Sequence, residues 1–238
     1  MSEIKNTGER IIVEKETPLM IARHLCAYRF TRDYARGRDV LDIGCGEGYG
    51  SHYLAGYARS VKGVDYDRQI IAYARNRYTK DNLSFEVMDI KDLGHLQRTF
   101  DCVCCFQVIE HIRETKMFLA GVLAVLGAGG TFICSTPNRL DASPGSSQPC
   151  NKFHVKEYVA YEFRELLGGN FGEANIFGLK RGRRLNFFRR IKKIGLFNFL
   201  PDSLNPVKRF YARIGCDDFF ITGAGLDTAL DFIAVCKK

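Results

Sequence analysis

Three features are absent from this chain of 238 residues, and each absence excludes a class of protein. No stretch approaches the roughly 20 consecutive apolar residues that a membrane-spanning helix needs. The opening residues, MSEIK, lack the apolar core of a signal peptide. No internal repeat is found. We therefore expect a cytoplasmic protein, and its length and 46% hydrophobic content suit one α/β domain with a sizeable core.

The nine cysteines show no C-x-x-C pair, and a zinc site would need such paired spacings. Their number is odd. Cys102, Cys104 and Cys105 fall in an apolar, strand-like run, and Cys45 lies in a glycine-rich loop. This distribution indicates buried free thiols in a reducing compartment.

A predicted strand, a glycine loop and a predicted helix follow one another near the N-terminal third of the chain. Residues 40–43 are apolar and indicate a buried strand, and residues 51–57 indicate a helix. Between them glycine occupies every second position, at Gly44, Gly46, Gly48 and Gly50. Such a loop lets the backbone approach a ligand at a helix N-terminus. The alternative is a tight turn that needs glycine for backbone reasons alone.

An acid about twenty residues further on favours the ligand-binding interpretation. Residues 61–65 predict a second strand that ends in Asp65, where an acid accepts hydrogen bonds from ribose hydroxyls. The dinucleotide pattern G-x-G-x-x-G would need glycine at position 49, which is Tyr49. The spacing G-x-G-x-G after Asp42 resembles the first motif of class I S-adenosylmethionine (SAM)-dependent methyltransferases, and Asp65 resembles their second.

This resemblance implies SAM as cofactor, S-adenosylhomocysteine as product, and a set of residues that contact them. Asp89 ends a third predicted strand, over 83–88, where the family has an acid that binds the exocyclic amine of adenine. The alternative role of Asp89 is to cap a short turn over 90–96. The cofactor-binding residues predicted in this way are Asp42, Gly44, Cys45, Gly46, Gly48, Tyr49, Asp65, Tyr66, Met88, Asp89, Ile90, Phe106 and Gln107.

Strands and helices alternate along the chain, which predicts an α/β fold with a mostly parallel sheet and helices on both faces. Further strands are predicted over 100–106, 131–135, 171–177 and 232–236. The resemblance implies a Rossmann-like sheet of seven strands, with the last strand antiparallel between strands five and six. We expect a single domain over 1–238, divided into an N-terminal arm and helix (1–37), a core (38–178), a basic insertion (179–222) and the last strand (223–238).

Few residues are suited to take a proton from an acceptor hydroxyl, as methyl transfer to oxygen requires. His111 follows the fourth predicted strand, Glu110 neighbours it, and His154 follows a Ser-, Pro- and Gly-rich loop that is expected to be mobile. An imidazole titrates near neutral pH without much tuning. In the alternatives, Glu110 caps a helix and His111 is a neutral core residue. Three other histidines, expected to be structural or exposed, are His24, His52 and His95.

The residues around His111 narrow the resemblance. Residues 106–111, FQVIEH, resemble the F-E-x-I-E-H stretch of small-molecule O-methyltransferases, including those of quinone biosynthesis and of bacterial surface-glycan clusters. Similarity to the glycan-cluster type extends to residues 135–138 (STPN), 151–158 (NKFHVKEY), 8–10, 24–30 and 230–238. This type implies O-methylation of a hydroxyl on a small molecule, a sugar or a glycan intermediate.

The chain departs from two family patterns. Some members with E-x-x-E-H bind a divalent metal there, but Gln107 replaces the first acid, and a neutral amide is a weaker ligand for a hard cation. We therefore expect no metal, although Glu110, His111 and His154 are a possible ligand set. The motif [N/D]-P-P-[Y/F], which holds a planar amine, is absent, and this disfavours methylation of nucleobases.

The net charge of +8 comes from one region. Residues 180–213 contain eleven lysines and arginines and a single acid, Asp202, so this segment carries +10 and the rest of the chain −2. On a helical wheel Phe188, Ile191 and Ile194 group on one side.

Three interpretations of the basic segment remain open. In the first, the segment is a helix packed on its own domain with a solvated basic face. In the second, residues 183–200 form an interfacial helix on the inner face of an anionic membrane. In the third, the segment contacts nucleic acid. The two alternatives for the whole chain are an RNA methyltransferase that uses this segment and a non-catalytic SAM-fold binding subunit. The intact glycine loop and acids argue against the second, and the sequence does not indicate an oligomeric state.

Overall fold

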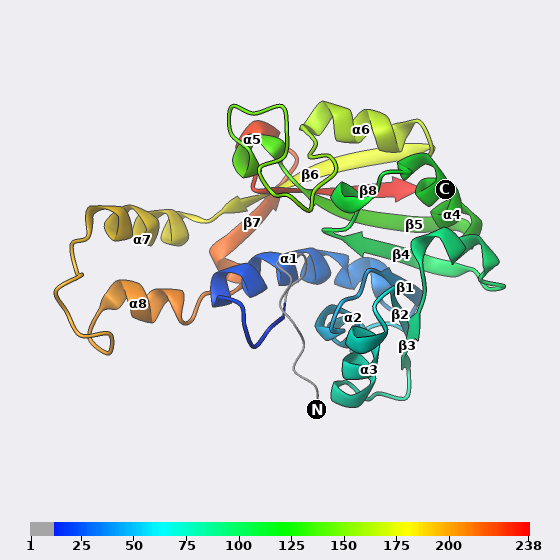
Figure 1. The fold of residues 1–238 in the computed structure, drawn as a ribbon, viewed down its shortest axis with the longest axis horizontal. Coiled ribbons are helices and arrows are strands. Elements are labelled where there is room, and N and C mark those ends of the chain that lie inside the picture. Colours follow the sequence, from blue (N-terminus) through cyan, green and yellow to red (C-terminus); the bar gives the residue numbers. More distant parts are fainter. Residues whose placement is uncertain (1–11) are drawn as a thin grey trace.

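The computed structural model describes residues 12–238, which form one eight-stranded sheet with helices on both faces (Figure 1). The strands are hydrogen bonded in the order β3-β2-β1-β4-β5-β8-β6-β7. Their bounds are β1 Asp39–Ile43, β2 Ser60–Asp65, β3 Leu83–Val87, β4 Phe100–Phe106, β5 Leu126–Pro137, β6 Glu173–Arg181, β7 Phe219–Thr222 and β8 Asp231–Lys237. The α/β class and the Rossmann-like architecture expected from the sequence are confirmed, whereas the resemblance of residues 8–10 lies outside the described part.

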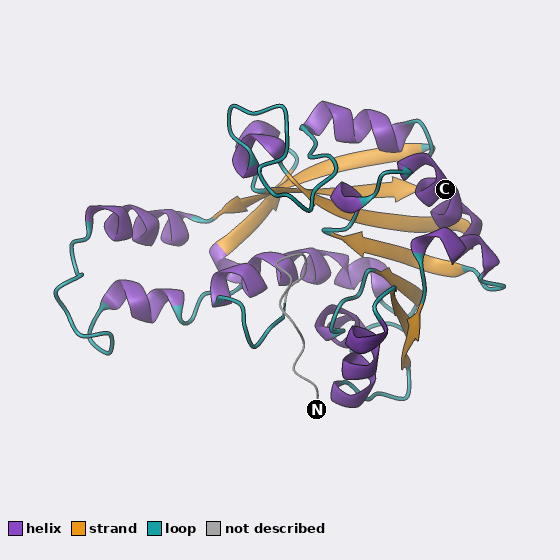
Figure 2. Cartoon of the chain, viewed as in Figure 1, coloured by secondary structure: helices purple, strands orange, loops and turns teal. Residues whose placement is uncertain are grey.

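The helices are distributed over the two faces of the sheet (Figure 2). One face is packed by α1, α2 and α3, and the other by α4, α6 and the short 3₁₀ helix η1. The helices are α1 Pro18–Ala35, α2 Tyr49–Leu54, α3 Arg68–Arg77, η1 Ile90–His95, η2 Ile109–His111, α4 Thr115–Val125, α5 Arg139–Ala142, α6 Ala160–Gly168, α7 Arg183–Ile194, α8 Pro206–Tyr211, η3 Cys216–Asp218 and η4 Leu226–Thr228.

The last strand has the position that the resemblance to class I methyltransferases implied. β8 pairs antiparallel with both β5 and β6, so β6 runs parallel to β5. The sheet has one strand more than expected, because β7 pairs antiparallel with β6 inside the segment assigned to the basic insertion. The part of that insertion outside the sheet is therefore residues 182–218.

Local chemistry sets the ends of the first helices. The side chain of Thr17 accepts a hydrogen bond from Met20 N at 3.3 Å, and Pro18 occupies the first helical position of α1. Asp67 caps α3 by accepting from Gln69 N at 2.8 Å. The inward face of α3 is apolar, and Ile70 and Ile71 are fully buried.

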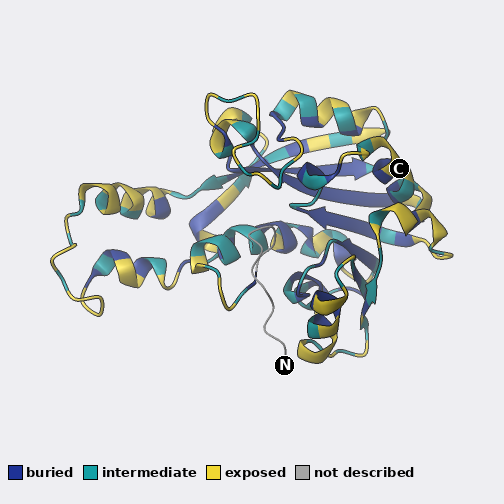
Figure 3. Ribbon diagram, viewed as in Figure 1, coloured by how far each residue is buried: buried dark blue, intermediate teal, exposed yellow. Residues whose placement is uncertain are grey.

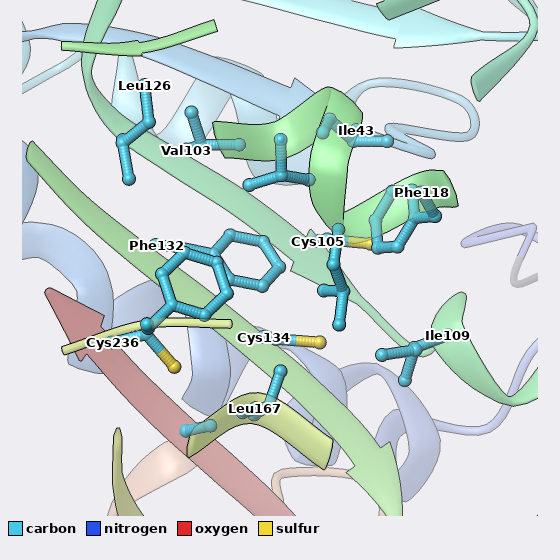
Figure 4. Close-up of a cluster of buried hydrophobic side chains, with 14 of the residues drawn as sticks. Ile43, Val103, Cys105, Ile109, Phe118, Leu126, Phe132, Cys134, Leu167 and Cys236 are labelled. Atoms are coloured by element: carbon cyan, nitrogen blue, oxygen red, sulfur yellow. The ribbon is translucent and has the colours of Figure 1, made fainter. Parts of the chain in front are cut away.

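The main core lies between the sheet and the α4–α6 face (Figure 3). Phe132 on β5 stacks on Phe171, with ring centroids 5.4 Å apart, and Figure 4 shows the surrounding side chains. Burying a phenylalanine side chain stabilises the fold by about 1.5–3 kcal/mol. All nine cysteines are free thiols, and seven of them are buried, as the sequence indicated. Within residues 12–238, no helix is long and apolar enough to cross a membrane.

Candidate active site

A cavity of about 830 Å³ opens at the carboxyl ends of β1, β2 and β4. Ligands of parallel α/β sheets gather at this edge, because the loops that follow the strands meet there. The predicted residues that line the cavity are Gly44, Cys45, Gly46, Tyr49, Asp65, Tyr66, Met88, Asp89, Ile90, Phe106, Gln107, Glu110, His111 and His154. The structure thus brings fourteen of the sixteen predicted site residues to one place.

The glycine loop crosses the bottom of this cavity in a conformation that glycine alone adopts without strain. Gly44 and Cys45 donate their backbone N–H groups to the Val64 carbonyl, at 2.8 and 3.0 Å. Gly46 has φ +54°, and a Cβ there would meet nothing within 4 Å, so its side faces open space. A Cβ on Gly44 would lie 2.4 Å from Val108. The loop therefore needs glycine both for its backbone angles and for close packing.

Asp42 and Gly48, which were predicted to contact the cofactor, do not line the cavity. The Asp42 carboxylate is fully buried, accepting from Ser51 Oγ at 2.5 Å and from the Tyr28 hydroxyl at 3.3 Å. Burial raises its pKa to about 6, and these hydrogen bonds offset part of the shift. Gly48 has φ +90°, and a Cβ would lie 2.6 Å from Phe85. Both residues support the loop from behind.

Asp65 is held at the cavity wall by the backbone. Its Oδ2 accepts from Gly46 N at 3.1 Å and its Oδ1 from Asp67 N at 3.0 Å. A carboxylate fixed in this way presents its oxygens with little loss of freedom on binding, which suits recognition of paired hydroxyls.

Asp89 has the capping role that the sequence offered as the alternative, and it also lies at the cavity wall. Its side chain caps η1 by accepting from Lys91 N at 3.0 Å, and the same residue lines the cavity. Met88 and Ile90 flank it as apolar wall residues. Capping fixes the orientation of the carboxylate and leaves the residue at the cavity wall.

Gln107 is the only non-glycine residue with positive φ among residues 12–238, at +56°. Such a conformation costs about 1–3 kcal/mol and is found at functional sites. Its backbone N–H donates to the Ser135 carbonyl at 3.0 Å, and its Nε2 lies 3.3 Å from Ser135 Oγ. The turn lets the chain leave β4 towards His111 without losing its hydrogen bonds to β5.

Two histidines meet beside Gln107. The Nδ1 of His111 lies 2.9 Å from the Phe153 carbonyl, which can only accept, so this nitrogen carries the proton and Nε2 has the lone pair. His154 Nδ1 lies 2.7 Å from Glu157 Oε1, and its Nε2 lies 3.0 Å from the Asn151 amide nitrogen. Asn151 Oδ1 accepts from Phe153 N, which orients that amide. The lone pair of His154 is therefore already engaged.

Glu110 is buried and connects η2 to the segment after the 141–150 loop. Its backbone carbonyl accepts from Val155 N and Lys156 N, at 2.7 and 3.1 Å, and its carboxyl accepts from Thr136 Oγ1 at 3.1 Å. Burial raises the pKa of Glu110 to about 8, so the carboxyl is largely protonated at neutral pH.

Glu110, His111 and His154 offer one ligand atom each within 4.8 Å of one another. The donor chemistry fits a divalent ion poorly. The carboxyl favours its protonated form, and both ring nitrogens of His154 have hydrogen-bond partners. A metal would have to displace the Asn151 amide and ionise Glu110.

Two residues of the cavity wall, Arg23 and His24, were not among the predicted site residues. Arg23 pairs with the carboxylate of Asp231 at 2.6 Å, joining α1 to β8 beside Gln107. His24, expected to be structural or exposed, is half-buried in the wall, with Nδ1 2.9 Å from the Tyr49 hydroxyl, and burial lowers its pKa to about 4. The similarity at 24–30 was the available signal for His24. His52 packs on Tyr78, and His95 is exposed.

A parallel sheet with an antiparallel strand inserted near one end, and a glycine loop followed by acids at successive strand ends, define a SAM-dependent methyltransferase. The chain belongs to the family described as "Methyltransferase domain", which matches residues 35–175. SAM is its cofactor.

Several relatives carry the same activity in their names. A probable SAM-dependent methyltransferase of Mycolicibacterium smegmatis is 40% identical over 167 residues, which is 70% of this chain but only 64% of the relative. One from Mycobacterium tuberculosis is 38% identical over 251 aligned positions, covering 98% and 89%. A ubiquinone biosynthesis O-methyltransferase of Coxiella burnetii is 32% identical over 106 residues, 44% and 45% of the two chains.

Solved structures agree on the fold. The putative methyltransferase solved in complex with the Haloferax volcanii Trm112 activator has a TM-score of 0.62 at 19% identity, covering 92% of this chain and 91% of that one. The N-methyltransferase NodS of Bradyrhizobium japonicum, solved with S-adenosylhomocysteine, has a TM-score of 0.61 at 15% identity, covering 94% and 89%. Because NodS is an N-methyltransferase, the shared fold does not determine the acceptor atom.

Proposed function

We propose that this enzyme methylates a hydroxyl group on a small molecule, a sugar or a glycan intermediate, and that His111 is the general base. The observation that carries the proposal is the place of His111 in the cavity wall, with Nδ1 2.9 Å from the Phe153 carbonyl, an acceptor that gives the neutral ring its lone pair at Nε2. The Coxiella relative named as an O-methyltransferase supports it over less than half of this chain.

The cavity divides into residues that would hold SAM and residues that would hold the acceptor. Gly44, Gly46 and Asp65 would receive the amino-acid portion and ribose, and Asp89 with Met88 and Ile90 would receive the adenine. Glu16, Met20, Arg113 and Met117 line the remaining wall, where the acceptor would enter. A cavity of about 830 Å³ is large enough for both molecules.

When bound, SAM supplies a methyl group on a positively charged sulfur together with a good leaving group. The work left to the protein is to align the hydroxyl oxygen with the methyl carbon and to accept the proton that the oxygen loses. His111 Nε2 takes this proton as the new O–C bond forms and the S–C bond breaks. The charge on the imidazolium is stabilised through Nδ1–H by the Phe153 carbonyl.

His154 acts as a positioning residue in this proposal. Its ring lies edge-on to His111, and it is fixed by the buried carboxylate of Glu157 on one side and by Asn151 on the other. A base that is held in one rotamer spends no free energy on alignment during the reaction.

The test combines acceptor discovery with one substitution. Purified enzyme and SAM are incubated with a panel of hydroxylated small molecules, sugars and glycans, and release of S-adenosylhomocysteine is measured. With an active acceptor, His111→Ala is expected to lower kcat about 10²- to 10⁴-fold, with SAM affinity unchanged by calorimetry. Turnover at the wild-type rate in this variant would show that the base lies elsewhere.

A further inference from the structure

The basic segment forms a helical hairpin that projects from the body of the enzyme. Figure 1 shows α7 and α8 side by side, beyond the ends of β6 and β7. Most residues of α7 are exposed, whereas Val207 and Phe210 of α8 are buried (Figure 3). The base of the hairpin packs on its own domain, because Leu185 of α7 and Phe210 of α8 belong to a buried cluster that includes side chains of α1 and β6. Leu185 is the only buried residue of α7. The interpretation as a helix packed on its own domain with a solvated basic face therefore holds for the base of the hairpin, and the rest of the hairpin projects from the domain.

The hairpin is an ordered structure. Phe188 of α7 stacks on Phe210 of α8, with ring centroids 4.2 Å apart and planes 8° from parallel. At the turn, buried Asn205 caps α8 by accepting from Val207 N at 2.9 Å, and its Nδ2 donates to the Phe197 carbonyl at 2.8 Å. The two helices and the loop between them therefore hold a defined shape.

The far end of this hairpin presents large apolar side chains to solvent. Ile194 is 72% exposed, Phe199 80% and Leu204 63%, and Leu196 is also exposed. Phe187, in the first half of α7, is exposed as well. These five are almost half of the large apolar side chains exposed among residues 12–238. Asn205 and the paired helices hold the tip in this exposed position, where no described residue covers it. A cluster of this kind marks a contact surface.

Cations lie along the two helices behind the apolar tip. Nine exposed lysines and arginines lie on the hairpin, and within the described chain only Arg184 and Lys208 of these have an acidic partner. The nine are Arg183, Arg184, Arg189, Arg190, Lys192, Lys193, Lys208, Arg209 and Arg213. Cations beside inserted apolar side chains are complementary to a bilayer surface with anionic head groups.

The hairpin also starts at the edge of the sheet where the active site lies. Because β6 runs parallel to β5, its carboxyl end is at the same edge as the cavity, and α7 follows directly. Arg181, the last residue of β6, contacts Asp141 at 3.3 Å in α5, which follows β5. The projecting surface and the entrance to the cavity are thus on one side of the molecule.

We propose that the 183–213 hairpin docks the enzyme on an anionic membrane surface, with Ile194, Leu196, Phe199 and Leu204 entering the head-group region and the flanking cations binding lipid phosphates. This goes beyond the methyl-transfer proposal and does not depend on it. A bilayer fits better than a nucleic acid, since nucleic-acid phosphates offer the tip no apolar phase. A second copy of this chain would bring two strongly basic surfaces together.

The test is co-sedimentation of the full chain with vesicles of phosphatidylcholine, with and without 30% phosphatidylglycerol, on the order of the anionic content that creates a surface potential. We expect binding to the anionic vesicles only. Phe199→Ser, and separately Arg189→Glu with Arg190→Glu, are each expected to reduce the bound fraction at least about fivefold. The matched controls on α6, Tyr161→Ser and Arg164→Glu, replace an exposed aromatic and an exposed cation, and should bind as the wild type does.

Three results would overturn the proposal: no binding to anionic vesicles at low salt, binding that the hairpin variants leave unchanged, or binding to an RNA oligonucleotide without binding to vesicles. SAM affinity is measured in each variant as a check on folding. Turnover of a water-soluble acceptor is expected to be unchanged by Phe199→Ser, so a failure of docking and a failure of the methyl-transfer proposal give different readouts.

Discussion

The ring of His154 meets the ring of His111 edge-on, with centroids 4.9 Å apart and planes at 81°. The two imidazole rings differ in the hydrogen-bond partners of their nitrogens. Nδ1 of His111 lies beside the Phe153 carbonyl, and the two ring nitrogens of His154 lie beside Glu157 and Asn151. In the mechanism proposed above, His111 is the base and His154 positions it.

Two substitutions distinguish these roles. His111→Ala is expected to lose turnover and to recover part of it when imidazole is added, because a diffusible base fills the space that the ring leaves. His154→Gln is expected to lower kcat about tenfold, because the ring of His111 is then held less firmly in its orientation, and added imidazole should not restore the rate. Rates with and without 50 mM imidazole, on the order of a saturating concentration, measure the contrast. Rescue of the His154 variant alone would reverse the assignment.

Asp65 is expected to control SAM affinity. Asp65→Ala removes the acceptor of the Gly46 and Asp67 N–H groups along with the carboxylate proposed to bind ribose. Each hydrogen bond to a charged group contributes about 1.5–3 kcal/mol, so loss of the two bonds proposed between the carboxylate and the ribose hydroxyls weakens SAM binding about 100-fold or more. Isothermal calorimetry with SAM gives the dissociation constant, and Asp65→Asn, which keeps one acceptor oxygen, should fall between. A wild-type value in Asp65→Ala would move the ribose elsewhere.

Glu110 predicts how stability changes with pH. Its pKa is 4.5 ordinarily and about 8 in the folded protein, so the folded state binds more protons than the unfolded chain between these values. The free energy of unfolding therefore falls as pH rises through this range, by about 1 kcal/mol per pH unit where the difference is complete, and levels off above pH 8.

Glu110→Gln keeps an acceptor for Thr136 but cannot ionise, so its stability should vary less between pH 6.5 and 8.5. Asp42, whose pKa is raised to about 6, acts with the same sign but is already mostly ionised throughout the range from pH 6.5 to 8.5. Denaturant unfolding of both proteins at the two pH values gives the comparison. Equal slopes in wild type and variant would exclude Glu110 as the cause.

Chelation is expected to leave turnover unchanged. The triad of Glu110, His111 and His154 has the spacing of a metal site, but both ring nitrogens of His154 have hydrogen-bond partners, and Gln107 in the same cavity wall is neutral. Initial rates are compared after dialysis against EDTA and after addition of Mg²⁺, Mn²⁺ or Zn²⁺. Loss of activity on dialysis with recovery on adding one ion would assign a metal to these side chains.

The parts of the site that depend on backbone pattern were predictable from the sequence. The glycine spacing, Asp65 and Asp89 each follow a strand, and strand ends meet at one edge of a parallel sheet, so their order along the chain placed them around one cavity. The orientation of the side chains was not predictable. Asp42 points to Ser51 and Tyr28 behind the loop, and Gln107 adopts positive φ, and neither follows from local sequence.

Contacts between distant segments were also beyond the sequence pattern. Arg23 and Asp231 are 208 positions apart, and only the packing of α1 against β8 makes them partners. β7 was not predicted as a strand and was included in the basic insertion, because Phe219–Thr222 is too short to show the two-residue period of a strand by itself. Only its pairing with β6, which the sequence pattern does not reveal, defines β7 as a strand.

The place of β8 between β5 and β6 has a consequence for the order in which the enzyme is built. β6 has no pairing with β5, so until residues 231–237 have been synthesised it can pair only with β7. The β6–β7 ribbon can therefore pair into the sheet of the first five strands only through the last strand. On the ribosome, β1 to β5 are thus synthesised before the strand that joins β6 and β7 to them.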